Sequence, residues 1–398
     1  MVSRTRPSGF TLVELIASAA VIALLMLMLV QMSRSTGDTW RHGMSKAEEF
    51  RESRRAFEVV TRRLALATLN TYWDYQWGKG VDPSTIDQSK PNAPAPTGYR
   101  RESELRFRVL QMDKVATELG YHPTHGVFFQ SPTGGEDSTD AYWSSFYTKP
   151  TDVGPVSRLD SLLASWGYFL EVSDVTTTMP PFLAKGATPQ YRSRLMEFRE
   201  DAKNLSIYKI GNETASDEWF TRPLSLTDQT RPVHPVAENI IAMVMLPKLS
   251  ATDEKSRRDN AAISAQYRLL SPTYDYDSKA HNNYGLAPEG IPVNALPNQI
   301  NPYNQLPPIV QVAMFALDQN SATRLAANAQ QQKSLDLTTL LQGLFQKAED
   351  FEAHDEVKGD LAELESRLHD RQLNYRLFVS DVSIRGARWS ASETDIQK

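Results

Sequence analysis

One acidic residue stands at the start of the longest apolar run in this chain. Glu14 precedes a stretch from Leu15 to Val30 that contains neither a charge nor an amide, and polar residues from Gln31 onward end it. A run of this length is close to the ~17–25 residues that a membrane-spanning helix needs. A carboxylate inside such a helix costs roughly 2.5–3.5 kcal/mol at the bilayer centre and less near its end. The pattern predicts one membrane helix whose acid is kept for a partner rather than for lipid.

Two simpler interpretations of the run are open. A secretory signal peptide has an apolar core of about 7–15 residues followed by a small-x-small cleavage site. Here the core is longer, an acid precedes it, and Gln31-Met32-Ser33-Arg34-Ser35 follows it. A plain membrane anchor explains the apolar residues but leaves Gly9, Phe10 and Glu14 without a role. Each of these interpretations therefore leaves part of the sequence unexplained.

The residues around the start of the run resemble a known signal. Phe10-Thr11-Leu12-Val13-Glu14, after a short basic leader that ends in Gly9, is similar to the type III signal of type IV pilins and of the pseudopilins of type II secretion. The resemblance implies that a prepilin peptidase cuts between Gly9 and Phe10 and that Phe10 is then N-methylated. It also implies that Glu14, the fifth residue of the mature chain, pairs with the amino terminus of a neighbouring subunit.

Composition restricts the class of protein. The chain has 398 residues, 40% of them hydrophobic, a mean hydropathy of −0.44 and a formal net charge of −5. Losing Arg4 and Arg6 with the leader would lower that charge by two, to −7. Such mild acidity gives no electrostatic footprint for nucleic acid, so we expect no nucleic-acid partner. Cysteine is absent, which excludes disulfides, thiolate metal sites and cysteine nucleophiles.

Charge asymmetry predicts the orientation in the membrane. Arg4 and Arg6 precede the apolar run within a very short leader, and basic residues stay on the cytoplasmic side. We therefore expect a single-pass protein of the inner (cytoplasmic) membrane with its amino terminus in the cytoplasm and its head in the periplasm. The partners expected are the prepilin peptidase, other pilin or pseudopilin subunits, and the inner membrane itself.

Helical character continues beyond the membrane segment. Phe50, Phe57 and Leu64 are spaced by seven, and Val60 and Ala67 extend the same apolar stripe. Charged residues surround this stripe, which predicts one long helix from about residue 10 to about residue 69.

The domain organisation follows from these boundaries. We expect a leader at 1–9, a transmembrane helix at 10–33, a periplasmic extension of it at 34–70, and a globular head at 71–398. Within the head, 78–98 and 248–308 are rich in Pro, Asn and Asp and are expected to be loops.

Alternating and continuous apolar runs in the head predict strands, and two proline-free segments near the carboxyl end predict helices. The expected strands are 104–110, 126–129, 166–172, 205–210, 236–246, 308–317 and 373–384. The expected helices are 322–346 and 349–371. The predicted fold class is α+β, with a long membrane-spanning helix packed on an antiparallel β-sheet head and extra helices near the carboxyl terminus.

A finer resemblance rests on scattered features. Leu306-Pro307-Pro308-Ile309-Val310 is similar to the strand entry of J-type minor pseudopilins. The length and layout are similar to prepilin-type proteins of verrucomicrobial gene cassettes, known as the cassette protein C group. These resemblances imply a minor pseudopilin-like subunit.

Candidate sites for chemistry in the head are weak. His122 and His125 flank a proline, so they do not share a helix face, and no third ligand is spaced to join them. Asp275 and Asp277 are two apart, as in calcium loops, but the glycine turn and distal Glu of an EF-hand are missing.

Glu365, His369 and Asp370 fit the solvated face of a polar helix. No Gly-x-Ser-x-Gly elbow and no Gly-rich phosphate loop occurs. We predict no catalytic residue, no metal and no cofactor, and therefore no enzyme.

The sequence thus predicts a structural subunit. It would be processed by a prepilin peptidase and assembled into a periplasmic or surface fibre of a type II secretion or type IV pilus-like system. The alternative is a membrane-anchored or fibre-displayed periplasmic binding module whose Pro- and Asn-rich loop forms the contact surface.

Overall fold

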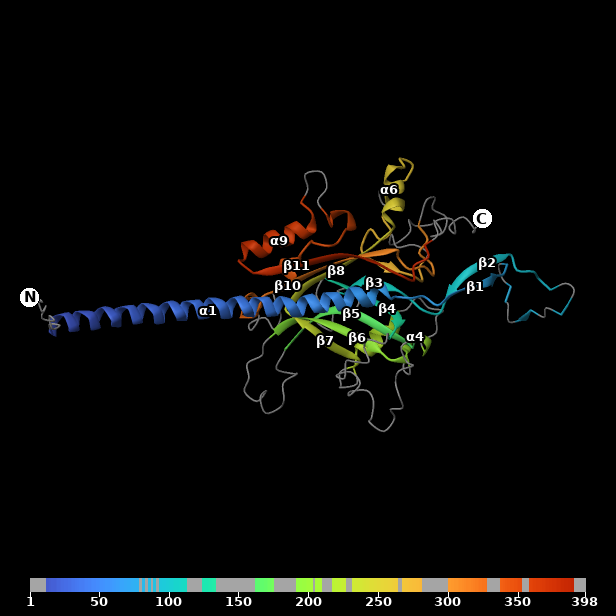
Figure 1. Ribbon diagram of the computed structural model, residues 1–398. Coiled ribbons are helices and arrows are strands. Elements are labelled where there is room, and N and C mark those ends of the chain that lie inside the picture. The colour runs from blue at the N-terminus through green and yellow to red at the C-terminus, as the bar shows by residue number, and fades with distance from the viewer. Residues whose placement is uncertain are drawn as a thin grey trace, which may run out of the picture. The chain divides into compact units, whose positions relative to one another are not determined.

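The computed structural model describes residues 12–78, 81–82, 85–86, 89–90, 93–112, 124–133, 162–174, 191–202, 205–209, 217–226, 231–263, 267–280, 300–327, 337–352 and 358–389. The chain divides into two compact units, Met1–Arg51 and Glu52–Lys398, and each is described by itself. Helix α1 (Leu12–Ala65) supplies the described part of the first unit and continues into the second (Figure 1). It ends four residues before the predicted position, where the amides of Leu66 and Ala67 tighten its last turn by bonding to the carbonyls of Arg63 and Leu64.

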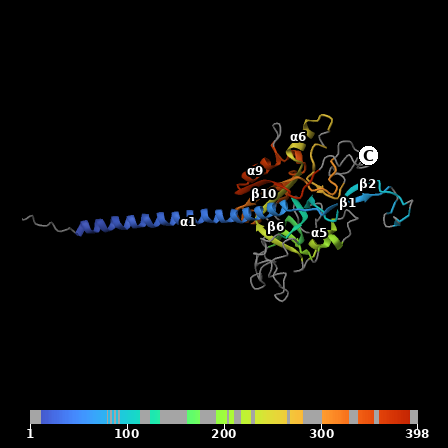
Figure 2. The same ribbon diagram turned by 45° about the vertical axis from the view of Figure 1, so that its right-hand side comes forward.

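The described strands of the second unit form three antiparallel sheets (Figures 1 and 2). The largest runs in the order β7 (Val233–Glu238), β6 (Tyr191–Glu200), β5 (Leu163–Asp174), β4 (His125–Pro132), β3 (Arg108–Gln111) and β9 (Tyr276–Asp277). The second runs β11 (Tyr375–Ser383), β10 (Ile309–Leu317), β8 (Ile240–Lys248). The third is a hairpin of β1 (Thr71–Gln76) and β2 (Gly98–Ser103). The predicted α+β fold class is confirmed.

The Glu52–Ala65 part of α1 packs on both larger sheets. Phe57 stacks on Phe378 of β11 with ring centroids 5.7 Å apart, and the guanidinium of Arg63 lies 3.9 Å from the ring centroid of Trp166 on β5. The predicted apolar stripe is the buried side of this helix segment, since Val60 and Leu64 are 1% and 0% exposed. One helix therefore covers one face of each larger sheet.

A short helix covers the opposite face of the six-stranded sheet. Phe220 of α5 (Glu218–Leu224) stacks on Phe128 of β4 with ring centroids 3.9 Å apart. Gly167, which pairs with Phe128, makes room for that ring, because a Cβ there would lie 2.3 Å from it. The aromatic packing on this face thus depends on a missing side chain in β5.

Helices near the carboxyl end cover the opposite face of the three-stranded sheet. They are α7 (Gln319–Ala327), α8 (Leu337–Leu341) and α9 (Asp360–Asp370), with a 3₁₀ turn η8 (Ala348–Asp350). Phe315 of β10 and Leu364 and Leu368 of α9 belong to one buried cluster, against which Leu377 of β11 also packs. Instead of the two long helices predicted, these are short pieces, and the positive φ angles of Gly343 and Phe345 turn the chain after α8.

Two of the strand predictions are wrong in detail. Residues 205–210 do not form a strand, because 206–209 form helix α4 (Ser206–Lys209), whose first residue bonds to Glu200 through both its amide and its hydroxyl. The run 236–246 is two strands in different sheets, broken at Asn239, which has a φ of 61°. Asn tolerates this left-handed conformation better than most residues.

The predicted 104–110 strand begins only at Arg108, as β3. The predicted long loop 248–308 contains helix α6 (Ala251–Asp259), whose amino end is capped by the Ser250 side chain, and strand β9. After the Ser250 cap, α6 consists mainly of charged and small polar residues and has no apolar stripe. Apolar periodicity therefore could not predict this helix.

Candidate membrane and assembly segment

The first unit presents a long apolar surface. Within α1, the 18-residue stretch Leu15–Met32 has a mean hydropathy of 2.5, and none of it is buried. At 1.5 Å per residue it spans about 27 Å, near the ~30 Å hydrocarbon core of a bilayer. Of the described residues, this is the one helix long and apolar enough to cross a membrane.

A polar group inside this stretch is satisfied locally. The Ser18 hydroxyl donates to the carbonyl of Leu15 at 2.9 Å. Because lipid offers no hydrogen-bond partner, back-bonding of this kind lowers the cost of a hydroxyl in an apolar segment. The serine is therefore compatible with a lipid-facing helix.

Of the three predicted site residues, Gly9 and Phe10 lie outside the described residues. Glu14 is the third residue of α1, directly before the apolar stretch, and its side chain is also outside the described part. An acid in the first helical turn is favoured by the helix dipole, typically by 0.3–1 kcal/mol. The position of Glu14 is therefore compatible with two roles: stabilising the first turn of the helix, and the assembly role that the sequence predicts.

In the second unit, Arg63 ties the end of α1 to the six-stranded sheet. Its Nη1 donates to the carbonyl of Thr133 at 2.7 Å while its guanidinium stacks on Trp166. Burial lowers the pKa of Arg63, and Tyr168 and Glu197 oppose this effect. Nearby, the Tyr168 hydroxyl donates to Glu197 at 2.7 Å. This polar cluster supplements the apolar stripe in holding the helix on the sheet.

The weak candidates of the sequence have structural roles. His125 is buried on β4, where its Nδ1 accepts from the amide of Met245 at 3.1 Å and its ring packs on Tyr274. His122 lies outside the described residues. On α9, His369 and Asp370 are exposed and Glu365 is half-buried, as expected of a solvated face.

Asp275 and Asp277 face arginines. Asp277 binds Arg106 through two hydrogen bonds, of 2.6 and 2.8 Å, and Asp275 binds Arg108. Burial by itself lowers the pKa of Arg108, but Asp275 and Asp217 raise it overall. Carboxylates already paired with arginines are poorly placed to bind a cation, and no cluster of metal-ligating side chains occurs among the described residues.

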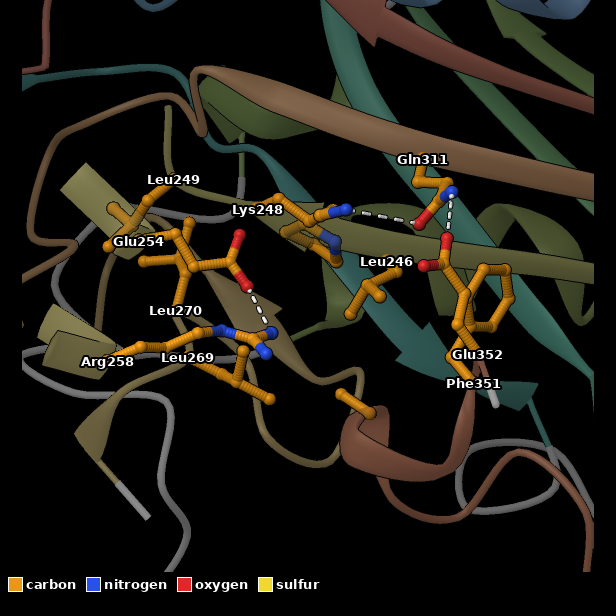
Figure 3. A pocket seen from close by; sticks show the side chains of 12 residues that line it. Leu246, Lys248, Leu249, Glu254, Arg258, Leu269, Leu270, Gln311, Phe351 and Glu352 are labelled. Carbon is orange, nitrogen blue, oxygen red and sulfur yellow. Dashed lines mark hydrogen bonds and ion pairs between the residues drawn. The ribbon is translucent and has the colours of Figure 1, made fainter. Parts of the chain in front are cut away.

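A pocket lies between β8, α6 and η8 (Figure 3). Part of its lining is apolar, and its polar groups bind one another: Arg258 binds Glu254 at 2.8 Å, and Gln311 donates to Glu352 at 3.1 Å. Its volume is about 40 Å³, whereas ligand pockets usually measure about 300–1,000 Å³. It has room for a few water molecules and not for a metabolite.

Sequence reasoning missed the β1–β2 hairpin. Thr71 to Gln76 was placed before an expected loop, although Tyr72, Trp73 and Tyr75 are residues that favour strands. The connection between the two strands is long and proline-rich, so it lacks the short-turn signal of a hairpin. The aromatic residues Tyr72, Trp73 and Tyr75 were the one feature of the sequence that could have predicted strand β1.

Comparison with known proteins bears on the amino-terminal segment. Residues 4–30 match the family model of the prokaryotic N-terminal methylation motif. The chain has a prepilin-type amino terminus. The motif is that of substrates of prepilin peptidase, and it supports a structural subunit of the type IV pilin and pseudopilin kind rather than an enzyme. No curated protein and no solved structure matches the chain.

Proposed function

We propose that this prepilin-type protein is a minor pseudopilin-like subunit. It is cut between Gly9 and Phe10, N-methylated at Phe10, and assembled through α1 into a fibre of a type II secretion or type IV pilus-like system. The observation that carries the proposal is the methylation motif at residues 4–30, which overlaps most of the exposed apolar stretch Leu15–Met32. The large head and long chain favour a minor subunit of the J-type or cassette protein C kind.

In this proposal the head lies in the periplasm and the basic leader in the cytoplasm. The Glu52–Ala65 segment of α1 packs on both larger sheets, so this part of the helix belongs to the head. The pocket between β8, α6 and η8 is too small for a metabolite, so this pocket gives the binding-module alternative no support.

Glu14 tests the assembly step. In the membrane a carboxylate and an amino group attract each other strongly because the dielectric constant is low. We expect Glu14→Leu to insert and fold normally but to lose most incorporation into the assembly, measured by cross-linking to neighbouring subunits in membranes. Glu14→Gln, which keeps the shape and loses the charge, should be nearly as defective.

The matched control is Glu58→Gln. Glu58 is an exposed acid further along α1, ion-paired with Arg54 at 2.9 Å, and exposed pairs contribute little. Incorporation of the control should therefore match that of the unaltered chain. Wild-type incorporation of Glu14→Leu would show that the acid has no assembly role.

A further inference from the structure

Three of the outer sheet edges in the second unit are protected against further pairing. β7 carries Pro235 next to a register shift, and β9 is only two residues long. At the outer edge of β8, the amide of Met245 bonds to His125, and Ser193 donates to the carbonyl of Ile240. Proline, bulges, short strands and covering contacts are the usual ways in which proteins prevent edge-to-edge association.

Within the described part of the chain, the edge of β11 has none of these protections. Asn374 and Ile384 direct their backbone groups toward β10, so the odd-numbered residues between them direct theirs outward. These are Tyr375, Leu377, Val379, Asp381 and Ser383. The strand has nine residues and no proline, its register with β10 is unbroken, and Val379 is 45% exposed.

The β1–β2 hairpin is also incomplete. It pairs with no other strand among the described residues, and in both views it stands away from the two larger sheets (Figures 1 and 2). Trp73, Tyr75, Tyr99 and Arg101 share one face, and the three aromatic side chains are 46–61% exposed. An isolated two-stranded hairpin is only marginally stable in water, so a third strand would stabilise it.

The outer edge of β1 pairs with no strand among the described residues, although the Thr71 amide there bonds to the carbonyl of Leu69 at 2.7 Å. Asn304 and Lys279 occupy the outer edge of β2 by donating to the carbonyls of Arg101 and Ser103. On β1, the carbonyl of Gln76 points toward β2, so Trp73 and Tyr75 direct their backbone groups outward. The Tyr75 amide is capped by the side chain of Asp74 at 2.8 Å.

We propose that β1 of one copy adds to the β11 edge of a second copy as an antiparallel strand. The two edges are complementary in a register that places Asp74 opposite Arg376. In that register Trp73 faces Leu377, Tyr72 faces Phe378, and Thr71 faces Val379, so apolar side chains lie beside apolar ones.

Charge and backbone bonding fit the same register. Arg376 makes no ion pair within the described part of the chain; its guanidinium lies 5.9 Å from the ring centroid of Phe378. On docking, the Asp74 carboxylate leaves the Tyr75 amide for Arg376, and that amide bonds to the carbonyl of Tyr375. No donor released by the hairpin is left without a partner.

The contact is heterologous, because it joins different surfaces of the two copies. Repeated contacts of this kind build an open filament rather than a closed dimer. The inference thus rests on the proposed function and deepens it, since it identifies a contact between the globular heads of two copies that complements assembly through α1.

Cross-linking in the full-length chain tests the pairing. The chain has no cysteine, so only introduced thiols can react. Thr71→Cys and Val379→Cys are placed in two differently tagged copies that are co-expressed and oxidised in membranes. Facing hydrogen-bonded residues of antiparallel strands have Cα atoms about 5.5 Å apart, within the range of a disulfide. We expect a disulfide between the two tags.

Two controls fix the register. Ser383→Cys, exposed on the same strand but four residues away, should not react with Thr71→Cys. Asp74→Arg in the first copy, or Arg376→Asp in the second, should reduce the yield roughly fivefold, and both together should restore it.

Absence of the 71–379 disulfide overturns the strand pairing, and a disulfide between two copies that both carry Val379→Cys shows a symmetric dimer instead. Processing at Phe10 is measured in the same samples. A processed chain without the disulfide leaves the proposed function standing, whereas an unprocessed chain shows that the proposed function has failed as well.

Discussion

Two neighbouring stretches of this chain use their apolar residues in opposite ways. Phe57, Val60 and Leu64 on α1 are 9%, 1% and 0% exposed, because they pack on the two larger sheets. A few residues later, Trp73 and Tyr75 on β1 are 55% and 46% exposed. The first set stabilises the fold of the head. The second contributes little to it, which is what a surface reserved for another subunit requires.

Truncation gives the largest expected difference between these regions. A chain that begins at about Gly43 keeps Phe57, Val60 and Leu64 and should fold without lipid. A chain that begins at about Asn70 loses them. Burying each such side chain is worth roughly 1.5–3 kcal/mol, and their sum is comparable with the ~5–15 kcal/mol stability of a typical domain. Thermal unfolding of both chains is the measurement; equal, cooperative transitions would show that α1 does not support the head.

Point substitutions sharpen the same contrast. Leu64→Ala should reduce the free energy of unfolding by about 2–5 kcal/mol, because Leu64 is fully buried. Trp73→Ala removes a larger side chain from an exposed position and should cost less than about 1 kcal/mol. Urea unfolding of each variant compares the two losses. A loss for Trp73→Ala as large as that for Leu64→Ala would contradict the division between folding and docking residues.

The titration of Asp360, the first residue of α9, should have the smallest effect on the stability of the fold. Burial raises the pKa of Asp360, and the charges of Asp350 and Glu363 add to this shift. The hydrogen bond that Asp360 accepts from the amide of Phe345 at 2.7 Å and the charge of Arg367 oppose it. Because the folded-state pKa is the higher one, this group stabilises the fold most below its unfolded pKa, and that contribution is lost as pH rises through the folded pKa.

Asp360→Asn keeps an acceptor for the Phe345 amide and cannot ionise. It should flatten the pH dependence of unfolding in the mildly acidic range, with a change below about 1 kcal/mol. Asp370→Asn, exposed on the same helix, is the matched control and should leave the curve unchanged. Equal pH profiles for Asp360→Asn and the unaltered chain would show that Asp360 does not titrate with folding.

Periodicity predicted the parts of the fold that depend on one strong apolar pattern. The stripe of Phe57, Val60 and Leu64 and the apolar run of β10 were both found, because a buried face leaves a regular trace in the sequence. Residues 206–209 were misread as strand, because four residues cannot distinguish a period of 2 from one of 3.6. The break at Asn239 depends on a backbone conformation that no pattern of apolar residues records.

The candidate site divides in the same way. The amino-terminal signal could be predicted from the sequence, because the methylation motif is a local pattern at residues 4–30. The open edge of β11 could not, because it depends on which strands lie beside it and on what protects the other edges. Contacts between distant segments, such as Arg63 with Trp166, carry no local signal either.

The most direct test of the account is the mass of the amino terminus of the protein extracted from membranes. A processed prepilin-type subunit should begin at an N-methylated Phe10, with residues 1–9 absent. An intact Met1, or an amino terminus beyond Val30, would contradict the account, because the chain would then be a plain anchored or a secreted protein.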